Sequence, residues 1–72
     1  MLGDRYQVFT SSGNYTTPGP VFGTWPAARE ARNEAFYQDA NVQSAWIMRT
    51  NPSMNLRQEK FGFTLRKEKH HA

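Results

Sequence analysis

The chain has 72 residues, a formal net charge of +3 and no cysteine. This length accommodates one domain, and the lack of cysteine excludes disulfides and thiolate metal sites. No apolar run approaches the ~20 residues that span a bilayer, and no apolar signal-peptide core follows Met1. We therefore expect one soluble, cytoplasmic domain that does not bind membranes.

The surplus of positive charge lies in the C-terminal part of the chain. Residues 1–53 contain four arginines and four acidic residues, whereas residues 54–72 contain five lysines and arginines against Glu59 and Glu68. A cationic segment favours acidic partners, either phosphate backbones or acidic protein surfaces. Its other interpretation is a solvated segment that only keeps the protein in solution.

The first part of the chain predicts a β-hairpin. Residues 6–10 are β-branched, aromatic or polar and contain no breaker, which favours a strand. Gly13 and Asn14 tolerate positive φ and predict a turn, after which residues 15–17 can return as a second strand. Pro18 and Pro20 lack the backbone donor of a sheet ladder, so we expect the second strand to end there, with a short edge piece at Val21 and Phe22 as an alternative.

A helix is predicted to begin around Thr24 and Pro26. The N-cap falls on Thr24 or Trp25. If Thr24 is the cap, its hydroxyl can accept a hydrogen bond only from the Ala27 amide, because Pro26 has no N–H to donate. Small and apolar residues then recur near the 3.6-residue period. They are Ala27, Ala28, Ala31, Ala35 and Phe36. Such small side chains favour close packing of the helix on a sheet.

Two further strands are predicted after the helix, over residues 42–49 and residues 61–65, with a loop over residues 51–55 between them. In the last strand the apolar residues alternate onto one face, and Gly62 marks a bulge or a close approach.

The element order β-(β)-α-β-β predicts an α+β fold in which one helix packs on a small antiparallel sheet of three or four strands. We expect one domain over residues 1–67 and a flexible basic tail over residues 68–72. A single helix covers one face of such a sheet, so the other face is exposed to solvent or covered by a partner.

No constellation of catalytic residues is found in the sequence. The two histidines, His70 and His71, lie beside the C-terminus, where nothing holds them in a reactive geometry and a third metal ligand is missing. The body of the domain has no histidine to activate its serines, and no phosphate-binding loop motif is present. We therefore expect a protein that is not an enzyme and that holds no cofactor or metal.

The string from Lys60 to Leu65 resembles part of the signature of RNA-recognition motifs, where a basic residue precedes alternating glycines and aromatics on a central strand. In that family the aromatics stack on bases, which would give this role to Phe61 and Phe63. The match covers a single strand, because Lys60 stands where the pattern has glycine and Glu59 where it has lysine or arginine. Packing in the core is the other interpretation of the two phenylalanines.

A second resemblance covers more of the chain. A tyrosine-containing first strand, a polar hairpin, Thr24 and Pro26 opening an alanine-lined helix, and strands ending in basic residues are similar to small phage-encoded host-takeover proteins. Phage inhibitors of bacterial RNA polymerase with a β-α-β-β layout are one example. The resemblance lies in size and element order and transfers no binding residue. It implies a protein that binds a host macromolecule and performs no chemistry itself.

Three functions are compatible with these features. The first is a protein-binding module or inhibitor that uses apolar loop residues as anchors. The second is binding of RNA or DNA by the basic, aromatic C-terminal strand. The third is self-assembly as a structural accessory protein, for which a homodimer would enlarge the thin core of so small a domain. The candidate partner-binding residues are Tyr15, Arg49, Met54, Arg57, Lys60, Arg66 and Lys67.

Overall fold

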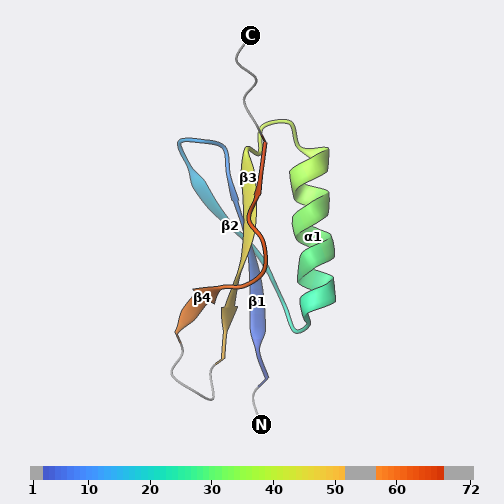
Figure 1. Ribbon diagram of the computed structural model, residues 1–72, viewed down its shortest axis with the longest axis vertical. Coiled ribbons are helices and arrows are strands. Elements are labelled where there is room, and N and C mark those ends of the chain that lie inside the picture. Colours follow the sequence, from blue (N-terminus) through green and yellow to red (C-terminus); the bar gives the residue numbers. More distant parts are fainter. Residues whose placement is uncertain (1–2, 52–56, 68–72) are drawn as a thin grey trace.

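One helix covers one face of an antiparallel sheet in the computed structural model, which describes residues 3–51 and 57–67 (Figure 1). The elements are β1 (Arg5–Ser11), β2 (Thr16–Phe22), α1 (Trp25–Gln38), β3 (Ser44–Thr50), β4 (Gln58–Lys60) and β5 (Leu65–Arg66). The sheet order is β2-β1-β3-β4, and β5 also pairs with β3. The predicted α+β class is therefore confirmed, with five strands because two short strands, β4 and β5, stand before and at the end of the segment predicted as the last strand.

The two central strands, β1 and β3, pair along their whole length. Their register sets Val8 opposite Ile47 and Phe9 opposite Trp46. Because side chains alternate between the two faces of a sheet, Val8, Ile47 and Ala45 point toward α1. All three are buried, and they form the floor of the core beneath the helix.

The strand β2 continues through the prolines that were expected to end it. The prediction was wrong because β2 is an edge strand, where a proline can turn its missing donor away from the ladder. A shift in the β1–β2 register between Gln7 and Phe9 accommodates the irregular backbone. The Gln7 side chain supports this bulge by donating from Nε2 to the Gly19 carbonyl at 3.1 Å.

The helix begins as the sequence predicts. Thr24 is the N-cap, and its hydroxyl accepts a hydrogen bond from the Ala27 amide at 3.4 Å. Ala28 is completely buried against Val8 and Ile47, so the absence of a longer side chain lets the helix approach the sheet closely. No helix in the described part of the chain is long and apolar enough to cross a membrane.

The segment after β4 leaves the edge of the sheet and crosses toward the helix. The prediction of one continuous strand over residues 61–65 was wrong, because Gly62 adopts φ +80° and turns the chain. Phe61 then packs against Tyr6 and Trp25, with ring centroids 5.6 and 4.9 Å away. Phe63 points outward and is 81% exposed, so the two phenylalanines do not share a face.

A buried arginine holds this crossing segment on the helix. Arg32 is 5% exposed and donates from Nη1 to the Phe63 carbonyl at 2.9 Å. Its Nε and Nη2 both donate to Asn33 Oδ1, so each of the three guanidinium nitrogens donates a hydrogen bond. Burial lowers the pKa of the Arg32 guanidinium, and nearby Arg29 lowers it further. The group nevertheless stays charged at neutral pH.

Candidate functional site

The helix α1 covers one side of the sheet and leaves the other side uncovered (Figure 1). The side chains on the uncovered side form what we call the open face. Alternation places every second residue of each strand there. The open face includes Arg5, Gln7, Phe9, Val21, Trp46, Met48, Lys60 and Arg66. These residues come from all five strands, so their arrangement depends on the pairing of the whole sheet.

Two aromatic rings lie at the centre of the open face. Phe9 and Trp46 are directly opposite one another on β1 and β3. Their rings are nearly parallel, with centroids 6.0 Å apart and an angle of 9° between the planes. Both side chains are half-buried, so they remain partly accessible to a ligand. Paired aromatic faces of this kind are suited to stacking against other flat groups.

Cationic side chains flank Trp46 along the neighbouring edge of β3. Lys60 pairs with Met48, and its Nζ lies 5.8 Å from the centroid of the Trp46 ring. Arg66 pairs with Ser44, two residues to the other side of Trp46. Both cations are exposed. A planar group stacked on Trp46 would therefore have a positive charge on either side along the strand.

Every charged residue on the open face is positive in the part of the chain that the structure describes. Its charged residues are Arg5, Lys60 and Arg66. The acidic side chains within residues 3–51 and 57–67 all lie off the open face. Glu30 and Glu34 are on the helix, and Asp39 is its C-cap. Glu59 faces Arg49 and Asp4 accepts from the Tyr6 hydroxyl, both on the helix-facing side. A surface with one sign of charge attracts ligands of the opposite sign.

Two other predicted cations are held by an ion pair or a hydrogen bond within the protein. Arg49 forms an ion pair with Glu59, and its guanidinium lies 4.6 Å from the centroid of the Phe61 ring. The hydrogen bond to Glu59 raises the pKa of Arg49. Lys67 donates from Nζ to the Asp39 carbonyl at 2.9 Å, where it stabilises the C-terminal end of α1. These contacts favour a structural role for both residues.

The remaining predicted residues lie away from the open face or outside the described residues. Tyr15 is 73% exposed in the turn between β1 and β2. Arg57 is exposed immediately before β4. Met54 lies outside the described residues, as do His70 and His71. Of the candidate residues, the structure thus places Lys60 and Arg66 on the open face.

Sequence reasoning missed Phe9, Trp46 and Arg5 as members of one surface. Each occurs in a segment that was predicted to be a strand, but the face of a strand follows from its register with its neighbours. The available signal was that Val8 and Phe9 are adjacent, so that only one of them can face the helix and the other must lie on the open face. Which of the two does so depends on β3, far away in the sequence.

The described residues offer no cluster for metal binding. Across residues 3–51 and 57–67, no three His, Cys, Asp or Glu side chains are close enough together to hold an ion. What the arrangement can do chemically is to stack planar groups and to attract anions.

Comparisons with protein-family models, curated proteins and solved structures found no match to this chain.

Proposed function

We propose that the chain is a non-enzymatic binding protein whose open face binds single-stranded nucleic acid. The observation that carries this proposal is the Phe9–Trp46 ring pair with cations beside it and no carboxylate on the same face within the described residues. An aromatic platform in a positive surface is the usual arrangement for binding single strands.

The two kinds of side chain supply different parts of the binding energy. A base stacked on an aromatic ring contributes about 1–3 kcal/mol, and every base has a face that can stack. Lys60 and Arg66 lie on either side of Trp46, where they can contact the phosphates that flank a stacked base. Gln7, the amide beside these rings, already donates to the Gly19 carbonyl. We therefore expect weak selectivity for base sequence.

A single strand is favoured over a duplex because its bases are accessible. In a duplex each base is stacked and paired, so the rings of the open face could reach it only after the base had been extruded, at a cost of a few kcal/mol. Duplex binding through phosphates alone would also rest on Arg5, Lys60 and Arg66, a small number of contacts.

Protein binding, including inhibition of a host macromolecule as in the phage proteins that the chain resembles, is the second candidate. It is favoured by Tyr15 and Phe63, which are 73% and 81% exposed. Large exposed aromatics are common anchors of protein interfaces. Both lie off the open face, so this function would use a different surface.

A salt titration tests the proposed function. The affinity of a labelled oligothymidylate of about 12 nucleotides is measured by fluorescence anisotropy at several salt concentrations. Each phosphate contact contributes about −0.7 to the slope of log K against log salt for single strands. We expect Lys60→Gln and Arg66→Gln each to reduce this slope by about that amount. Arg29→Gln removes the same charge from the exposed side of the helix and should leave the slope unchanged.

Stacking is tested separately. Trp46→Leu keeps an apolar side chain but loses the aromatic face, so we expect affinity to fall at least about fivefold, the equivalent of 1 kcal/mol. The proposal is wrong if the unmodified protein fails to bind the oligonucleotide at low salt. It is also wrong if Arg29→Gln weakens binding as much as Lys60→Gln.

A further inference from the structure

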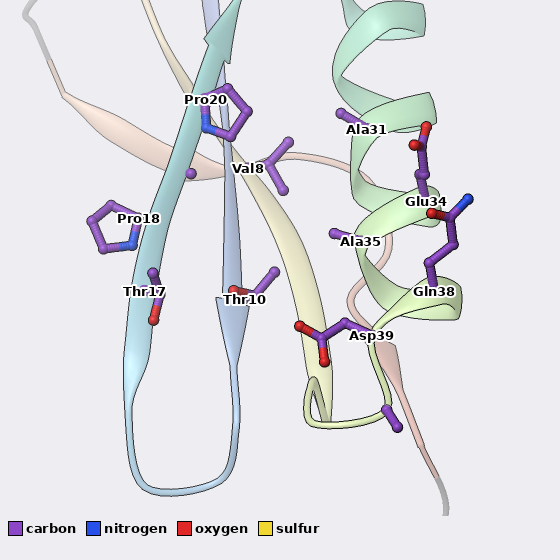
Figure 2. A pocket seen from close by; sticks show the side chains of 12 residues that line it. Val8, Thr10, Thr17, Pro18, Pro20, Ala31, Glu34, Ala35, Gln38 and Asp39 are labelled. Carbon is purple, nitrogen blue, oxygen red and sulfur yellow. The ribbon is translucent and has the colours of Figure 1, made fainter.

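A groove lies on the other side of the sheet, between the C-terminal half of α1 and the β1–β2 hairpin (Figure 2). Its volume is about 700 Å³. Figure 2 shows Val8 pointing into it from β1, and Ala31 and Ala35 pointing into it from the helix. The wall opposite the helix consists of residues 17–20 of β2.

The groove exists because the side chains along it are short. Ala31 and Ala35 do not reach across to β2, and α1 packs mainly over β1 and β3. Gly19 has no side chain, and a Cβ there would lie 2.8 Å from the Val8 carbonyl oxygen. Larger residues at these positions would fill the space or displace the strand.

The chemistry of the groove differs from that of the open face. Its floor, formed by Val8, Ala31 and Ala35, is apolar, and Glu34 and Asp39 supply its charged side chains. Thr10, Thr17 and Gln38 add uncharged polar groups to the lining. No lysine or arginine is among the residues that line it, all of which the structure describes. An apolar floor beside carboxylates complements a ligand that combines apolar and cationic groups.

We infer that the groove is a docking site for a short basic peptide segment of a partner protein. An apolar side chain of the peptide would occupy the floor over Ala31 and Ala35, and flanking lysines or arginines would pair with Glu34 and Asp39. The carboxylates repel phosphate, so nucleic acid is a poor occupant. This inference is independent of the proposed function, because it concerns the opposite side of the sheet.

Nuclear magnetic resonance with ¹⁵N-labelled protein tests the inference. The probe is a capped hexapeptide of alternating lysine and leucine, and its matched control has glutamate in place of lysine. We expect the lysine peptide to shift the amide signals of Gly19, Ala31, Ala35 and Ala40, which line the groove. The glutamate peptide should leave these signals unchanged.

Variants separate the contribution of charge from that of shape. Ala35→Leu fills the groove and should abolish the shifts. Glu34→Gln and Asp39→Asn keep the packing and should each weaken binding at least twofold. Asp4→Asn lies just before β1 and outside the groove lining, so it removes the same charge and should not alter binding. Thermal unfolding of Ala35→Leu confirms that it is folded, and the two charge variants decide the matter if it is not.

Three results would overturn the inference. They are equal binding of the two peptides, shifts confined to the open face, and the absence of shifts at millimolar peptide. Binding of an uncharged apolar dye in the groove, with no binding of the lysine peptide, would assign the groove to small molecules and also overturn it.

Discussion

Gly62 and Trp25 show how a single contact controls the path of the chain. The indole packs against Tyr6 and Phe61, and the crossing segment passes directly over it at Gly62. A Cβ at position 62 would overlap Trp25 Cη2 and lie 3.1 Å from Cζ2 and Cζ3. The positive φ of Gly62 is also unfavourable for any residue with a side chain.

Gly62→Ala should therefore destabilise the fold. A left-handed alanine costs about 1–2 kcal/mol, and overpacking against the ring adds about 1–3 kcal/mol. We expect the free energy of unfolding to fall by about 2–5 kcal/mol in urea titrations followed by circular dichroism. Gly23→Ala is the matched control, since a Cβ at Gly23 meets nothing within 4 Å. We expect this variant to change the free energy of unfolding by no more than about 0.5 kcal/mol. Equal stability of the two variants would mean that the crossing segment simply moves aside.

The sequence predicted part of this contact. Glycine between two aromatics indicated a bulge or close approach, and a close approach is what the structure has. The identity of the partner was not predictable, because Trp25 belongs to the start of the helix. The contact arises from tertiary packing rather than from local preference. Arg32 was missed for the same reason, since its partner is the backbone carbonyl of Phe63.

At the scale of elements, β2 is the informative case. Proline lowers the local preference for a strand, and the chain was expected to leave the sheet at Pro18. That preference is overridden at an edge, where β2 pairs on one side only. The prolines then have a second effect, because they remove donors from an edge that would otherwise be open to pairing with another chain.

Restoring these donors should promote self-association. We expect the double variant Pro18→Thr, Pro20→Thr to form dimers that increase with concentration in sedimentation-velocity experiments. The unmodified chain should remain monomeric over the same range. Val21→Thr, in the same strand, adds no backbone donor and serves as the control. A double variant that stays monomeric would show that the edge is protected by something other than its prolines, whereas dimers of the unmodified chain would support a self-assembling protein.

The helix was predicted more successfully than the strands because its determinants are local. The cap at Thr24 and the spacing of Ala28 and Ala31 depend on neighbouring residues in the sequence. The open face, in contrast, depends on contacts between residues that are far apart in the sequence. Phe9 and Trp46 meet only when β1 and β3 adopt their register, and Lys60 approaches Trp46 only through β4.

Across the whole molecule, the fold separates the charges that the sequence mixes. The surplus of positive charge in the C-terminal part of the chain predicted a positive region, but the Lys67 ammonium donates a hydrogen bond to the Asp39 carbonyl at the end of the helix. The open face receives Lys60 and Arg66 from this region and Arg5 from the opposite end of the chain. The carboxylates of the described residues remain on the helix and the helix-facing side. The result is two surfaces of different chemistry, divided by the sheet.

The division predicts that an oligonucleotide and a basic peptide bind at the same time. The helix packs on one side of the sheet (Figure 1), the groove lies between that helix and the β1–β2 hairpin, and Trp46 points to the other side, so we expect that neither ligand obstructs the other. We expect the ¹⁵N spectrum of the protein with both ligands to show the shifts of Trp46 and Lys60 produced by the oligonucleotide together with those of Ala31 and Ala35 produced by the peptide. The shifts should add, because Phe9, Trp46, Lys60 and Arg66 are not among the residues that line the groove.

Direct association of the two ligands is measured in a sample without protein, and its contribution is subtracted. Glu34→Gln should then weaken the peptide response while leaving the oligonucleotide response intact, and Lys60→Gln should do the reverse. If saturating oligonucleotide displaces the peptide from the groove in the unmodified protein, the two surfaces are coupled or shared. The view of the sheet as a barrier between two independent sites would then be incorrect, even if each ligand binds when added alone.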